Sequence, residues 1–137
     1  MADTLHGAVT RNSGLSYLFT DKHHGGGTSQ DACWCVTKDE EFAVFDLADL
    51  SDLRDDGGRF FGVLPDETGE LRDLGTKLEQ VAEFPLSTSG VWHGYPSWPL
   101  SEGSHRQRPG KHVFDAMVMM GLMTRRQHKR MMKGKHT

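Results

Sequence analysis

The clearest pattern of residues that could do chemistry is a run of positive charge late in the sequence. Six lysine or arginine residues and no acidic residue fall within residues 124–137. At about 100° per residue, five of them share one side of a helix predicted over residues 124–134. These five are Arg125, Arg126, Lys129, Arg130 and Lys133. Such side chains neutralise phosphates, so the pattern predicts a helix face that binds nucleic acid or an acidic protein surface.

Two helices are expected to hold this face in place. An apolar stripe predicts the first over residues 112–120, ended by Gly121. Thr124 and Gln127 then have the spacing of a capping box that begins the basic helix. The two form a helix–turn–helix-like pair. A DNA-reading unit usually has a third helix, and here Arg125 and Gln127 are the obvious candidates for reading bases.

A second group of candidate residues lies in a segment rich in aromatics and proline. Trp92, Tyr95 and Trp98 could stack on a base, a sugar or a proline. His93 could act as a general acid or base near neutral pH. Basic residues that could steady a phosphate beside it are Arg106, Arg108 and Lys111.

This second group supports an enzymatic alternative, a small metal-independent nuclease or transferase that uses His93. The other interpretation is structural. In it, the three rings cover the sheet and the histidine makes a hydrogen bond that supports the fold.

A third group combines two histidines with two cysteines. His23, His24, Cys33 and Cys35 lie within 13 residues and are of the types that bind zinc. The Cys-x-Cys spacing is tighter than that of the usual zinc knuckle, so two reduced thiols are the alternative. A Cys35 nucleophile paired with His93 has no supporting local motif. Zinc is therefore the one cofactor to test, in a zinc-stabilised adaptor, and otherwise we expect none.

Composition bounds what these groups can belong to. The chain has 137 residues, of which 36% are hydrophobic and 26% charged, so one soluble domain is expected. Residues 1–85 carry 17 acidic and 7 basic side chains, whereas residues 86–137 carry 2 and 9. The basic end could therefore bind nucleic acid, an anionic membrane surface or the acidic body of its own chain.

Several classes of function are disfavoured by what the sequence lacks. No phosphate loop, nucleophile elbow, zinc-protease helix or dinucleotide fingerprint occurs, which disfavours the large nucleotide-enzyme classes. The longest uncharged apolar run, residues 116–123, is far shorter than a membrane span. The first residues show no signal peptide. We therefore expect a cytoplasmic protein with no membrane partner, and its oligomeric state stays open.

The remaining elements are expected to build an α+β domain over residues 15–137, preceded by a loose arm over residues 1–14. Strands are predicted at 15–20 and 59–64, with 70–74 returning beside the latter after a turn at 65–69. A hairpin is predicted from 32–37 and 42–47.

Three further segments complete the prediction. Leucines at 47, 50 and 53 predict one short helix with an acidic outer face from Asp46 to Asp56, ended by Gly57 and Gly58. That acidic row is either a solvated face or a docking surface for a basic partner. Residues 76–84 fit a helix or a strand, and residues 86–108 read as irregular. We therefore expect a small non-enzymatic interaction module.

Overall fold

The computed structural model describes residues 8–11, 14–18, 33–86, 90–99 and 109–137, and the statements below concern these ranges. Strands β1 (Ala8–Thr10) and β2 (Ser16–Leu18) form one antiparallel sheet. A second antiparallel sheet has the order β3-β4-β5, from Phe60–Gly62, Val81–Phe84 and Tyr95–Trp98. The helices are α2 (Lys38–Leu50), α3 (Lys111–Met119) and α4 (Arg125–Met132). This mixture confirms the predicted α+β class.

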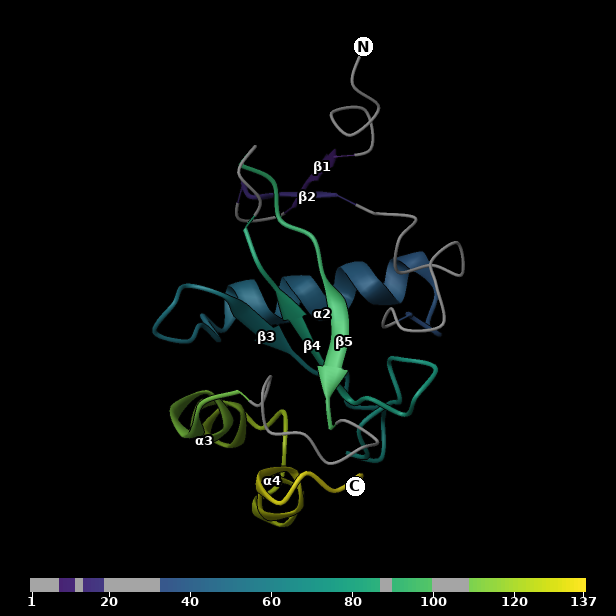
Figure 1. The fold of residues 1–137 in the computed structure, drawn as a ribbon, viewed down its shortest axis with the longest axis vertical. Helices are drawn as coiled ribbons and strands as arrows, with labels where there is room; N and C mark the ends of the chain where they lie inside the picture. The colour runs from purple at the N-terminus through teal and green to yellow at the C-terminus, as the bar shows by residue number, and fades with distance from the viewer. Residues whose placement is uncertain (1–7, 12–13, 19–32, 87–89, 100–108) are drawn as a thin grey trace.

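The elements surround one aromatic core. Figure 1 shows α2 lying across one side of the larger sheet, with α3 and α4 beyond the end toward which β5 runs. Phe45 of α2 packs against Phe60, Phe84 and Tyr17, with ring centroids 4.8–6.0 Å apart. Gly62 allows this close approach, because a Cβ there would lie 2.7 Å from Val44.

Helix α2 corrects the predicted hairpin over residues 32–47. Thr37 and Glu40 form a capping box at its start, and three acidic residues in the first turn favour the positive end of the helix dipole. Phe42, Phe45 and Ala48 recur every three residues, and all three are buried. This helical spacing outweighs the short alternating runs that suggested strands. Trp34 keeps one isolated bridge to Gly75.

The leucine stripe predicted for the acidic helix is also wrong. Helix α2 ends at Leu50, well before the two glycines, and Leu50 is 68% exposed. Leu53 is buried, but it lies beyond the helix, after Asp52 has turned the chain with a φ of 51°. The face of α2 that packs inward is therefore the one that carries the phenylalanines.

Three further predictions meet the structure differently. The strand predicted near residues 59–64 is confirmed as β3, but its partner is β4, and residues 70–74 supply only a bridge from Leu71 to Pro65. The open choice at 76–84 is resolved as the strand β4. Residues 86–108 are not wholly irregular, since β5 lies among them.

The N-terminal residues that the structure describes are tied to the body. Strand β1 lies inside the range expected to be a loose arm and pairs with β2. Arg11 follows it and makes two hydrogen bonds to Asp46 of α2, of 3.1 and 2.7 Å. Its guanidinium also lies 4.4 Å from the centroid of the Phe42 ring. Asp46, a member of the predicted acidic row, is therefore paired rather than solvated.

The helix pair α3 and α4 confirms its sequence signals. Gly121 follows α3 with a φ of 76°, and Gly134 follows α4 with a φ of 72°. Thr124 and Gln127 form the predicted capping box, with hydrogen bonds of 2.8 and 3.1 Å. Among the described residues, no helix has both the length and the apolar character to cross a membrane.

Candidate nucleic-acid interface

One side of α4 fastens the helix to the sheet. Met131 is fully buried, and its carbonyl oxygen accepts a 2.8 Å hydrogen bond from the indole nitrogen of Trp98. His128 is buried beside it and stacks on Phe114 of α3, with centroids 5.4 Å apart. The position of α4 is thus fixed by apolar contacts and leaves the opposite side of the helix outward.

The outward side carries the five basic residues named from the sequence, and they fall into two groups. Arg125 pairs with Asp115 of α3 at 3.3 Å, and Arg130 donates two hydrogen bonds to the His136 carbonyl. Arg126, Lys129 and Lys133 are exposed, and their side chains make no ion pair or hydrogen bond with any residue that the structure describes. Three positive charges one turn apart therefore face solvent.

The candidates for reading bases are engaged elsewhere. The Gln127 side chain accepts from the backbone of Thr124 and donates a 3.0 Å hydrogen bond to the carbonyl of Gly69. Arg125 is held by Asp115. With both polar readers occupied, the face offers charge rather than a base-reading pattern of donors and acceptors.

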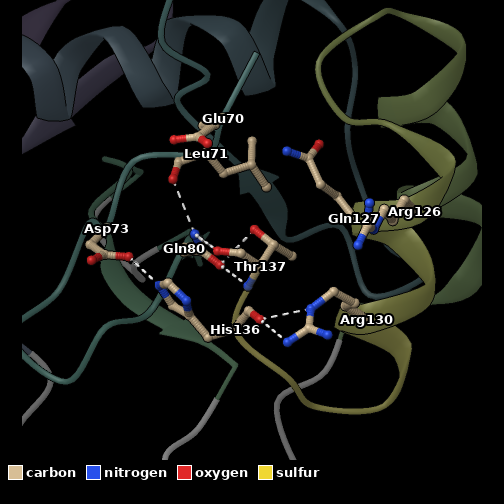
Figure 2. Close-up of a pocket in the computed structure, with 9 residues that line it drawn as sticks. All are labelled: Glu70, Leu71, Asp73, Gln80, Arg126, Gln127, Arg130, His136 and Thr137. Carbon is tan, nitrogen blue, oxygen red and sulfur yellow. Dashed lines mark hydrogen bonds and ion pairs between the residues drawn. The ribbon is translucent and has the colours of Figure 1, made fainter. Parts of the chain in front are cut away.

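A cleft of about 500 Å³ opens beside this face. Figure 2 shows α4 on one side of it, the segment from Glu70 to Asp73 on the other, and Gln80 near the middle. Its lining residues are Glu70, Leu71, Asp73, Gln80, Arg126, Gln127, Arg130, His136 and Thr137. The volume falls within the range of small-ligand sites in proteins.

Hydrogen bonds join the two walls of the cleft at its two ends. At one end Gln127 bonds to Gly69 across the opening. At the other end the His136 ring contacts the Asp73 carboxylate at 2.6 Å, while Arg130 holds the carbonyl of His136. The cleft is therefore part of the folded structure and needs no rearrangement to form.

The buried Gln80 side chain anchors the floor. Its amide nitrogen donates to the carbonyl of Leu71 at 3.0 Å, and its oxygen accepts from the backbone N–H of Thr137 at 3.0 Å. Its burial, with 1% exposure, makes these bonds expensive to lose. Gln80 therefore connects the sheet to the segment that follows α4.

The electrostatics between α3 and α4 favour a neutral histidine. Burial lowers the pKa of His128, and the positive charges of Arg125 and Lys111 act in the same direction. The Asp115 carboxylate, 3.8 Å from Nδ1, opposes this shift. Nε2 of His128 has no hydrogen-bond partner among the residues that the structure describes. The helix pair is thus best packed when this ring is uncharged.

The stacking candidates lie mostly inside the fold. Trp98 is fully buried and Trp92 is 5% exposed, packed 4.7 Å from the Phe60 ring. Tyr95 is half-buried and hydrogen-bonds to Glu83, and burial raises its pKa. This placement favours the interpretation in which the rings cover the sheet, since neither indole offers an open face to a ligand.

The structure describes only some of the residues of the enzymatic alternative. His93 is half-buried and precedes Gly94, whose carbonyl accepts from the indole of Trp34. Lys111 pairs with Asp115 at 2.9 Å, one turn along its own helix. Arg106 and Arg108 lie outside the described residues. The role of His93 as an acid or base stays a prediction.

The zinc prediction also stays untested. His23 and His24 lie outside the described residues, and the described ranges contain no group of three potential metal ligands. Cys33 and Cys35 form no disulfide bond with any residue that the structure describes. Burial raises the pKa of Cys35, and the nearby Asp73 carboxylate raises it further, which disfavours the thiolate needed for nucleophilic attack.

The acidic body is not the partner that the structure gives to α4. Its arginines are used within the body: Arg72 pairs with Glu40, and Arg59 pairs with both Asp55 and Glu83. The described ion pairs of α4 reach only Asp115 of α3. Self-pairing between α4 and the acidic row is therefore absent from the described residues.

The cleft is the feature that sequence reasoning missed. Its walls meet through pairs far apart in the chain, such as Gly69 with Gln127 and Asp73 with His136. The turn predicted at residues 65–69 was the only local signal for one wall. Comparisons with models of known protein families, with curated proteins and with solved structures find no match for this chain. The functional argument therefore starts from α4 and the cleft.

Proposed function

We propose that this protein is an interaction module that binds the phosphate backbone of nucleic acid through the outward face of α4. The observation that carries the proposal is a set of three exposed basic side chains, those of Arg126, Lys129 and Lys133. These side chains have no hydrogen-bond or ion-pair partner among the described residues. Basic side chains on the surface that stabilise a fold usually face a carboxylate, as the arginines of the body do here. Basic side chains that are spaced one helical turn apart and face no carboxylate are instead suited to bind successive phosphates.

The proposal includes a limit on strength and selectivity. Helix α4 has eight residues and is about 12 Å long, so it can contact only a few phosphates. Gln127 and Arg125 are engaged within the fold, so we expect little selection among sequences by this helix face. Three phosphate contacts on a single strand would give a salt slope near −2 on logarithmic axes, at about −0.7 per contact.

The test is a fluorescence-anisotropy titration of labelled single-stranded oligomers at about 50 and about 200 mM salt. The variant is Lys129→Gln with Lys133→Gln, which removes two charges without touching the buried side of α4. We expect weaker binding at low salt and a slope reduced by about 1.4. Deleting the whole helix would be a poorer test, because Met131 and His128 are buried against the sheet and α3.

The matched control is Lys38→Gln with Lys77→Gln, which removes the same charge outside α4. We expect this control to bind much as the unmodified protein does. Equal losses in both variants would mean that overall charge, not α4, governs binding. No binding at low salt, together with binding to an acidic polypeptide such as polyglutamate, would replace nucleic acid with an acidic protein surface as the partner.

A further inference from the structure

We infer that the cleft beside α4 receives an unpaired nucleobase that carries an amino group, so that the module prefers single-stranded cytosine over uracil. This inference rests on the proposed function, because α4 must first hold the strand by its phosphates. It adds a second binding site, the cleft, and a chemical selection that the open charges alone do not provide.

The geometry of α4 places the two sites next to each other. Arg126 and Arg130 are four residues apart, so they lie on the same side of the helix, and both line the cleft. Lys129 and Lys133 lie further round toward solvent. A nucleic-acid strand whose phosphates lie along Arg126, Lys129 and Lys133 would therefore have its nucleobases at the mouth of the cleft.

The size and form of the cleft suit a flat polar ring. Its volume of about 500 Å³ exceeds what one base needs, and Leu71 supplies an apolar surface in its wall. Base pairs in a duplex cannot enter, because their edges are already paired and stacked, whereas an unpaired base can be turned into a protein pocket. The hydrogen bonds from Gln127 to Gly69 and from His136 to Asp73 fix the opening of the cleft in the protein without a ligand.

The charges of the lining decide which bases fit. Asp73 is engaged by His136, and the buried amide of Gln80 is fully used by Leu71 and Thr137. The Glu70 carboxylate is exposed and accepts no hydrogen bond from any residue that the structure describes. A free carboxylate accepts from an amino group, such as the N4 amino group of cytosine, and repels the O4 oxygen of uracil.

The position of Glu70 is fixed by the turn before it. The Asp66 carboxylate accepts from the backbone nitrogen atoms of Thr68 and Glu70, at 2.8 and 3.1 Å. The backbone nitrogen of Asp66 in turn donates to the Glu70 carbonyl at 2.8 Å. The carboxylate therefore extends from an anchored backbone, as a selective contact requires.

The experiment compares oligocytidine with oligouridine of about 12 nucleotides, since the two bases differ only around positions 3 and 4. We expect the protein to bind oligocytidine about fivefold more tightly, and Glu70→Gln to bring this ratio close to one. Glu67→Gln is the matched control. It removes the same charge from the same turn at a residue that does not line the cleft, and it should keep the ratio.

The outcomes separate this inference from the proposed function. Equal binding of both oligomers, with the salt dependence and the loss in the α4 variant intact, would overturn the cleft inference alone. A preference for cytidine that survives Glu70→Gln would also overturn it. Failure to bind either oligomer at low salt would overturn the proposed function, and the cleft inference with it.

Discussion

The acidic body of the chain (residues 1–85) and its α3–α4 end differ in whether their basic side chains are paired with carboxylates. In the body, Arg11, Arg59 and Arg72 each pair with at least one carboxylate, and the Glu83 side chain, a partner of Arg59, is only 3% exposed. On α4, Arg125 is the only arginine or lysine with an ionic partner among the described residues. The basic residues of the body therefore stabilise the fold, whereas most of the basic residues of α4 have no ionic partner among the described residues.

This difference separates stability from recognition. If the open bases of α4 serve a partner, their removal should weaken binding and leave the fold intact. If the paired charges and aromatic rings of the body serve the fold, their removal should do the reverse. Each of the following predictions tests one side of that contrast.

The largest expected effect lies in the aromatic core of the body. Phe45→Ala removes a fully buried ring that packs against Phe60, Phe84 and Tyr17. We expect the free energy of unfolding to fall by about 3–5 kcal/mol in a denaturant titration. A loss below about 1 kcal/mol would mean that this ring does not centre the core.

A smaller effect is expected from the charges themselves. Arg11→Gln breaks a two-point contact with Asp46, in which both side chains are less than one quarter exposed. We expect a loss of about 1–2 kcal/mol in the free energy of unfolding. Lys129→Gln with Lys133→Gln should change it by less than about 0.5 kcal/mol. Equal losses in the two variants would remove the contrast between body and α4.

The smallest effect is a dependence on pH at the α3–α4 contact. The pKa of His128 is lowered from its ordinary value of 6.5, so the unfolded chain binds a proton there more readily than the folded one. Stability from this residue is complete above pH 6.5 and is lost as the pH falls through the folded pKa. The opposing pull of Asp115 keeps the effect small.

The measurement is thermal unfolding of the unmodified protein and of His128→Gln between about pH 7.5 and pH 5. The unmodified protein should lose more stability over this range than the variant, which has no titrating ring. Parallel curves would show that His128 is not the group responsible.

The parts of the fold that could be predicted are those with local signals. Gly121, Thr124, Gln127 and Gly134 mark the ends of α3 and α4, and these helices lie where the sequence placed them. Helix α2 was missed although Thr37 and Glu40 carry the same capping pattern. There, short runs of alternating residues suggested strands, and the spacing of Phe42 and Phe45 on the buried face was the better guide.

The candidate site was predictable only in its helical half. The basic residues of α4 stand close together in the sequence, so their shared face follows from helical geometry. Gln80, just before β4, reaches the same cleft through its hydrogen bond to Thr137 after α4, which no local pattern encodes. The burial of Trp92 and Trp98 likewise depends on contacts with distant elements.

The most direct test of the central contrast is a map of backbone amide chemical shifts during titration with single-stranded oligocytidine. We expect the largest changes in α4 and at Lys133, which follows it, and at Glu70 and Leu71 across the cleft. The amides of α2, in the acidic body, should change little. Shifts concentrated in α2, or no shifts at low salt, would contradict the proposal that α4 is the nucleic-acid interface.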